Sequence, residues 1–247
     1  MLLDDVREMR KAKDPNIPAG QQTEKTEDPY ILQRLALATY KSKYPSAQEA
    51  LKEARNLLAL LEPQTSNDTE TLGLWGSVHK QLWELTKDES HLDEAVRAYE
   101  RGFYLRNDYY NGINFAFLLN VRAANTAEPA EAISDFVQAR RVRKEVLSIC
   151  EQWLVDNPAP SSLEGPPKIA TKHPESRYWL LATVAEAYFG VGDAAEGQRR
   201  LDEALSAAPE EWMGKTTQDQ IGKLKELLVS RLPAKVPPAD CIINLIP

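Results

Sequence analysis

Apolar residues recur at intervals of three and four along most of this sequence, and Pro, Gly or polar steps interrupt them at regular places. One such run is Leu51, Ala54, Leu57, Leu58 and Leu61. This spacing is typical of the buried face of an amphipathic helix, and no segment alternates with period two for long, as a strand would. The interruptions fall at residues 44–45, 62–63, 86–90, 107–108, 127–129 and 158–168. The sequence therefore predicts an all-α fold of paired helices.

The helix pairs recur at a spacing of about 35 residues, which indicates a repeat array. The clearest unit is YWLLATVAEAYFGVGDAAEGQRRLDEALSAAPEEW, residues 178–212. Small side chains let two antiparallel helices approach closely, large ones fill the gap to neighbouring helices, and Gly-Asp and Pro steps end the two helices. Along the unit these positions are Ala185, Tyr188, Gly192, Asp193, Gly197, Leu201, Ala204 and Pro209. Their order resembles the tetratricopeptide repeat signature.

Less regular units precede the clear one. Residues 29–62 form a degenerate first pair, a helix over 71–85 opens a second, and helices over 111–124 and 129–155 make a third. A final helix over 217–232 is expected to seal the exposed apolar end of the stack, as terminal caps of repeat arrays do. The predicted architecture is a tetratricopeptide-like α-solenoid of about four helix pairs with a C-terminal capping helix.

The aromatic segment RGFYLRNDYYNGIN, residues 101–114, is interpreted as a corner between two repeats. Ala95, Tyr99 and Gly102 lead into it with the same spacing as the small and large positions of the clear unit, and Asn107 takes the place of the final Pro. The helix over 71–85 that opens this second pair is expected to be followed by a turn about seven residues longer than in a regular repeat.

Three regions are expected along the chain: a flexible leader over residues 1–28, a helical repeat domain over 29–232 and a C-terminal tail over 233–247. The leader is polar, carries Pro and Gly, and lacks apolar periodicity. In the tail, Pro237 and Pro238 are followed by an apolar run. We expect this run to pack against the last helices; it could instead occupy the groove, pair with another chain or begin a further domain.

Composition excludes several classes of partner. The formal charge is −7, from 30 basic and 37 acidic residues without a long basic run, which argues against nucleic acid. The apolar stretches are far shorter than the roughly 20 residues of a membrane span, and the N-terminus has no secretory apolar core, so no membrane and a cytoplasmic location are expected. The sequence has two cysteines, Cys150 and Cys241, whose number and spacing give neither a metal cluster nor a disulfide framework, so they are interpreted as buried or incidental thiols.

No catalytic motif is found, so the sequence predicts neither an enzyme nor a cofactor. His79, His91 and His173 have no further ligand at metal-binding spacing, and no metal site is expected. The Gly-Val-Gly at residues 190–192 ends a helix, whereas a dinucleotide loop opens one after a strand. A kinase would need a Gly-rich loop, an HRD segment and a DFG motif, and the chain has none of them.

A wider resemblance extends over about residues 30–232. The segments ETLGLWGSVHKQLWEL, AYERGFYLRNDYYNGINFAFLL and RYWLLATVAEAYFGVGDAAEG together are similar to the central tetratricopeptide region of the apoptosis signal-regulating kinases, also described as a TRAF-binding domain, and to its bacterial relatives. The most specific positions are Tyr99, Gly102, Phe103, Tyr109, Gly112, Ile113 and Asn114. The resemblance implies a regulatory scaffold that docks other proteins, with an attached effector or sensor domain possible.

Stacked repeats bend into an array whose first helices line a concave surface, so binding residues are expected on those helices. The alignment of the repeats predicts that a polar groove with aromatic walls lies on this surface. Its predicted residues are Glu70, Ser77, Lys80, Asn111, Asn114, Leu118, Trp179, Glu186 and Phe189. Side-chain amides and a lysine can hold an extended peptide by its backbone or its terminal carboxylate. The alternatives are that Asn111 only caps its helix and that Asn114 only bonds to the preceding turn.

The basic stretch QARRVRKE offers a second candidate surface, with Arg140, Arg141, Arg143 and Lys144. It could receive an acidic segment of a partner, or it could be an ordinary solvated helix face.

The function predicted from these features is a non-catalytic protein–protein interaction and regulatory scaffold module, which presents a concave helical groove to a partner peptide or domain. The alternative is a small-molecule or nucleotide sensor whose ligand lies in the groove and changes the curvature of the array.

Overall fold

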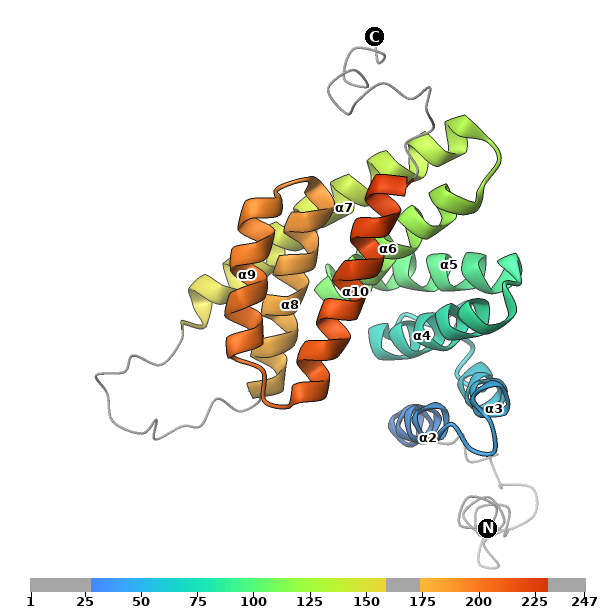
Figure 1. Ribbon diagram of the computed structural model, residues 1–247. Helices are drawn as coiled ribbons and strands as arrows, with labels where there is room; N and C mark the ends of the chain where they lie inside the picture. The colour runs from blue at the N-terminus through green and yellow to red at the C-terminus, as the bar shows by residue number, and fades with distance from the viewer. Residues whose placement is uncertain (1–27, 159–173, 231–247) are drawn as a thin grey trace, which may run out of the picture.

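The computed structural model of the chain describes residues 28–158 and 174–230, which are helical throughout apart from short turns (Figure 1). The helices are α2 (Pro29–Ser42), α3 (Ala47–Ala59), α4 (Thr69–Thr86), α5 (Glu89–Arg106), α6 (Tyr109–Asn125), α7 (Pro129–Asp156), α8 (Pro174–Val191), α9 (Ala194–Ser206) and α10 (Glu211–Ser230). The predicted tail and all but the last residue of the predicted leader lie outside the described residues.

Successive helices pack against one another in pairs. The pairs are α2 with α3, α4 with α5, α6 with α7, and α8 with α9, and each pair also contacts the next. In Figure 1 the pairs follow one another along the chain, from blue to orange. The prediction of an all-α, tetratricopeptide-like solenoid of four helix pairs is therefore confirmed.

Most helices begin at a side-chain cap that can be read from the sequence. Asp68, Asp88 and Asp108 each accept a hydrogen bond from a backbone N–H in the first turn of α4, α5 and α6. Such caps satisfy N–H groups that have no partner within the helix. At Lys87 and Asn107 the chain leaves α4 and α5 in the left-handed conformation, with φ of 58° and 51°.

The predicted corner at residues 101–114 is confirmed, because α5 ends at Arg106 and α6 begins at Tyr109. The longer turn expected after the first helix of the second pair is wrong. Only Lys87 and Asp88 separate α4 from α5, because each of these helices runs for 18 residues. The additional residues lengthen the helices and leave the turn short.

Glycines let large side chains pass between neighbouring helices. The ring of Tyr99 on α5 packs against α4 at Gly76, where a Cβ would lie 2.7 Å from the ring. A Cβ at Gly112 would lie 2.6 Å from the ring of Phe103. Because atoms cannot approach so closely, the glycines set the distance between helices, and the aromatic rings fill the space that they leave.

Helix α10 is the predicted final helix, but it begins at Glu211 rather than at residue 217. It contacts α8 and α6, and Figure 1 shows it running beside α8 and crossing in front of α6. The hydroxyls of Thr217 and Tyr178 lie 2.6 Å apart, and Lys223 Nζ lies 3.2 Å from Glu84 Oε1 of α4. The chain's own last helix thus covers part of the face formed by the first helices.

Candidate interaction surface

The first helices of the four pairs, α2, α4, α6 and α8, lie side by side, since each contacts the next. In a repeat array of this kind these helices line the concave surface, and we call their exposed surface the inner face. Helix α10 covers the inner face at α6 and α8. The part formed by α2, α4 and the first turn of α6 is lined by exposed side chains and is called the open half.

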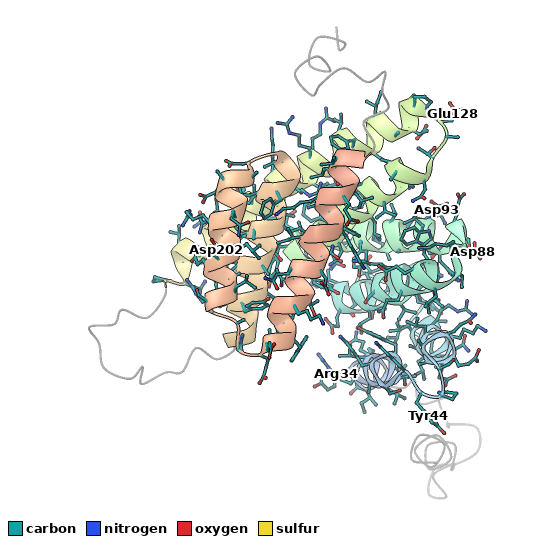
Figure 2. All side chains as sticks on the ribbon, viewed as in Figure 1. Arg34, Tyr44, Asp88, Asp93, Glu128 and Asp202 are labelled. Carbon is teal, nitrogen blue, oxygen red and sulfur yellow. The ribbon has the colours of Figure 1, made fainter. Side chains whose placement is uncertain are left out.

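Four exposed side chains define the open half: Tyr30, Arg34, Glu70 and Tyr110. They are between 48% and 61% exposed. Arg34 lies 5.2 Å from the centre of the Tyr30 ring, and its Nη2 is 3.6 Å from Glu70 Oε1. In Figure 2, Arg34 lies at the edge of α2, away from the turn that carries Tyr44. Such an exposed ion pair contributes little stability, so both partners can exchange it for another contact.

The floor beside the open half is polar but uncharged. Ser77, a predicted groove residue, is half-buried. Burial raises the pKa of Tyr40 and of Tyr99, and the nearby Ser77 hydroxyl offsets part of that effect. Both phenols therefore keep their protons at neutral pH and supply hydroxyl groups rather than charges.

Lys80 and Asn114 lie where the open half meets α10, and both are half-buried. Lys80 Nζ is 3.5 Å from Asn114 Oδ1 and 4.5 Å from the centre of the Phe117 ring. Asn114 Nδ2 donates to the carbonyl oxygen of Tyr110 at 2.9 Å, which is the bond to the preceding turn that the sequence left open as an alternative. The two residues lie together on the inner face, although contacts within the chain occupy part of their hydrogen-bonding capacity.

Asn111 does not line the groove, and the prediction for this residue is wrong. Its side chain is 1% exposed and lies between α4 and α5, where Nδ2 is 3.4 Å from the carbonyl oxygen of Thr69. A Cβ at Gly102 would come within 2.6 Å of the Asn111 amide. Asn111 is therefore a packing residue of the corner.

The predicted groove residues of α8 lie in the covered part of the inner face. Glu186 and Phe189 are buried, with Gln220 Nε2 3.5 Å from Glu186 Oε1 and Lys225 Nζ 3.9 Å from the Phe189 ring centre. Trp179 is half-buried, and its ring centre is 6.2 Å from that of Trp212. These side chains meet α10 and do not form an open groove.

Three charged side chains of α4, α7 and α8 interact electrostatically, and we call Lys80, Arg143 and Glu186 the charge centre. Burial raises the pKa of Glu186, and the cations Arg143 and Lys80 oppose this effect. Burial also lowers the pKa of Lys80, and it lowers that of Arg143 to about 10. Within the described residues none of the three forms an ion pair within 4.0 Å. The Glu186 carboxylate attracts both cations without forming an ion pair with either.

The predicted basic surface of α7 is divided between two environments. Arg141 and Lys144 are exposed and Arg140 is half-buried, whereas Arg143 is 0% exposed. Arg143 Nη1 donates to Asn120 Oδ1 at 2.7 Å, and its Nε and Nη2 have no hydrogen-bond partner among the described residues. The prediction that Arg143 belongs to an exposed basic cluster is therefore wrong.

A contact between histidines was missed in the sequence. His79 Nδ1 and His91 Nδ1 are 3.2 Å apart across the hairpin of α4 and α5. Burial, followed by the nearby His91 and Arg55, lowers the pKa of His79 to about 3. No group of three or more His, Cys, Asp or Glu side chains that could hold a metal ion occurs in the described part of the chain. The pair shares a hydrogen bond in which one ring donates and the other accepts.

Comparison with known proteins supports the repeat type. A family model described as Tetratricopeptide Repeats-Sensor matches residues 6–119, a stretch that contains α2 to α5 and most of α6. No curated protein and no solved structure matches the chain. Among the described helices, none combines the length and apolar character that crossing a membrane requires. The chain thus carries repeats of the tetratricopeptide type, and the matched stretch contains every residue that defines the open half.

Proposed function

We propose that this protein is a non-catalytic protein–protein interaction module that binds a partner peptide or domain on the open half of the inner face. The observation that carries the proposal is the group of exposed aromatic and charged side chains on α2, α4 and α6, namely Tyr30, Arg34, Glu70 and Tyr110. Aromatic and arginine side chains are the types most enriched where protein interfaces concentrate their binding energy.

The chemistry of the open half suits a protein ligand. Tyr30 and Tyr110 offer ring surface with few rotatable bonds, and Arg34 can form paired hydrogen bonds with a carboxylate or with backbone carbonyls. Within the chain, Arg34 already pairs with a carboxylate, that of Glu70, at 3.6 Å. An acidic side chain of a partner would replace it, while Glu70 would be released to bind a backbone N–H or a cation of the same partner.

The finer role proposed is regulatory scaffolding in signalling, with an effector or sensor domain attached or associated. It rests on the resemblance to the kinase repeat region, which extends over about residues 30–232. Repeat families of this type are generally non-enzymatic, which supports the proposal of a binding role.

A small-molecule sensor is the second candidate, and one specific observation favours it. Arg143 Nε and Nη2 and Asn120 Nδ2 are buried N–H groups without acceptors among the described residues. Buried donors of this kind seek an acceptor, either an ordered water or an anionic ligand group. A sensor would bind its ligand at the charge centre and would leave the open half unused, so the two candidate functions depend on different residues.

The test compares two arginine reversals in the full chain. Arg34→Glu alters the open half, whereas Arg97→Glu is the matched control, because Arg97 also forms an exposed ion pair with a glutamate, on α5. Each tagged protein would be used for affinity purification from native extract, and its folding would be checked by circular dichroism. We expect a partner retained by wild type and Arg97→Glu and reduced at least about tenfold by Arg34→Glu, in proportion to a loss of about 1.4 kcal/mol or more.

Equal retention by both variants would contradict the proposed site. A small molecule released from wild type on denaturation, and absent after Arg143→Met, would favour the sensor.

A further inference from the structure

Helix α10 contacts the inner face through one side of the helix. Met213, Ile221 and Leu224 are buried on that side, and Thr217 lies between them in sequence and is buried as well. The intervening residues Lys215 and Asp219 are exposed. This is the pattern of an amphipathic helix lying in a groove, with anchors recurring at helical spacing.

The inner face meets α10 with polar groups as well as apolar ones. The hydroxyl of Tyr178 is 2.6 Å from that of Thr217, and Lys225 Nζ lies 3.9 Å from the Phe189 ring centre. Each of these contacts requires a particular side chain at a particular position of the helix. The inner face therefore selects a helix by the order of its side chains as well as by its apolar character.

Charged and polar contacts also fix the position of α10 along the inner face. Glu84 and Glu186 of the inner face both contact α10. Lys223 Nζ lies 3.2 Å from Glu84 Oε1, and Gln220 Nε2 lies 3.5 Å from Glu186 Oε1. The Lys223 and Glu84 side chains are 56% and 34% exposed, and the Gln220 bond is at the long limit. Contacts of this kind fix register but hold a helix weakly.

The position of α10 also carries a cost. It lies against Glu186, which is buried and forms no ion pair within 4.0 Å among the described residues. Charges that are buried without close partners oppose the burial that produces them. Gln220 gives Glu186 a single hydrogen bond at the long limit of 3.5 Å, so α10 itself offsets little of this cost.

We propose that the inner face of α6 and α8 is a helix-binding groove, that α10 occupies it as an intramolecular competitor, and that an amphipathic helix of a partner protein displaces α10. Counted from Met213, α10 carries apolar anchors at positions i, i+8 and i+11, a hydroxyl at i+4 and lysines at i+10 and i+12. The partner helix has the same order, with its lysines placed to meet Glu84 and the Phe189 ring. This rests on the proposed function, in which the protein binds other proteins, and it assigns the covered part of the inner face to a second, helical ligand.

The experiment uses a fluorescent synthetic peptide of residues 211–230 as the probe and measures its binding to the full chain by fluorescence anisotropy. In Lys223→Glu, a glutamate meets Glu84, so repulsion replaces attraction and the resident helix is held less tightly. Lys215→Glu makes the same charge change on the exposed side of α10 and is the matched control. We expect Lys223→Glu to bind the peptide at least about tenfold more tightly than wild type or Lys215→Glu does.

A charge-swapped variant guards against simple misfolding. Glu84→Lys combined with Lys223→Glu restores the ion pair in reverse, so the resident helix closes again and the wild-type peptide is excluded, as in the unmodified protein. Hydrogen exchange over α10 should follow the same order, fastest in Lys223→Glu. Equal peptide affinity in Lys223→Glu and Lys215→Glu, or binding by the charge-swapped variant as strong as that of Lys223→Glu, would overturn the proposal. Neither result bears on Arg34, so failure here leaves the test of the open half intact.

Discussion

Arg143 of α7 lies directly against Gly190 of α8, at a point where a Cβ on the glycine would be 2.1 Å from the arginine Nε. A buried guanidinium needs room for a flat, wide group, and only glycine leaves that room on a neighbouring helix. Because the same guanidinium bonds to the side chain of Asn120 of α6, this contact links three helices, α6, α7 and α8. The position of the charge centre depends on it.

Replacing Gly190 by alanine should therefore destabilise the protein. The new methyl group displaces a fully buried side chain that has no free space, which costs about 1–3 kcal/mol in overpacked cores. The matched control is Gly222→Ala in α10, where a Cβ meets nothing within 4 Å. That variant should be neutral, or up to about 1 kcal/mol more stable through higher helix propensity. Urea unfolding of both variants measures the difference, and equal midpoints would contradict the packing described.

Arg143 and Glu186 should be energetically coupled although they do not touch. Arg143→Met removes the cation with the larger effect on the buried Glu186 carboxylate and should cost about 3 kcal/mol or more, as is usual when a buried charge loses its compensation. Glu186→Gln removes that charge, so the double variant should lose less stability than the sum of the single ones. A double-mutant cycle by chemical unfolding gives the coupling energy. Strict additivity would show that the two charges do not interact.

The order and pairing of the helices could be predicted because the signals are local. Asp108 begins α6 by accepting a hydrogen bond from the Asn111 N–H, and Asn107 ends α5 in the left-handed conformation. The close-packing glycines could also be placed, since their spacing repeats from one unit to the next. Such signals do not depend on where the remainder of the chain lies.

The candidate site could be predicted only in part, because it depends on contacts between distant segments. Arg143 was grouped with Arg141, since charged residues on a helix are usually solvated; only the space above Gly190 makes its burial possible. The repeat pattern ends near Pro209 and does not state where the next helix lies. The covering of Glu186 by α10 therefore could not be read from the sequence.

Arg101 should determine the order of the loop between α3 and α4. Its guanidinium donates to the carbonyl oxygens of Gln64, Thr65 and Ser66, at distances of 3.2, 3.1 and 2.9 Å. Arg101→Ala should speed amide hydrogen exchange across residues 62–68 and lower stability by about 1–2 kcal/mol. Arg101→Lys keeps the charge without the planar fork and should restore only part of the protection. If amide exchange in the loop is the same in wild type, Arg101→Ala and Arg101→Lys, the hydrogen bonds of Arg101 do not order the loop.

Stability should fall as the pH is lowered from about 6.5 toward 3, and His79 should account for part of this slope. Its pKa is lowered to about 3 in the folded protein, against about 6.5 in an unfolded chain. Between these values the unfolded state binds the extra proton, so acid favours unfolding by up to about 1.4 kcal/mol per pH unit.

The check is the urea midpoint of wild type and His79→Gln, measured at several pH values between 4 and 7. The variant should show a shallower dependence, and His91→Gln, which keeps His79, should retain most of the wild-type slope. Parallel curves for wild type and His79→Gln would contradict the assignment.

The central claim is that partners bind on the open half of the inner face, and site-specific photo-crosslinking tests it most directly. Tyr110 of α6 and Tyr104 of α5 are almost equally exposed, at 48% and 50%, but only Tyr110 belongs to the open half. A photoreactive phenylalanine would replace each in turn, with irradiation in native extract. The account predicts a crosslinked partner from position 110 that is absent from position 104 and is lost when Arg34→Glu is added. A partner captured from position 104 alone, or from position 110 regardless of Arg34→Glu, would contradict it.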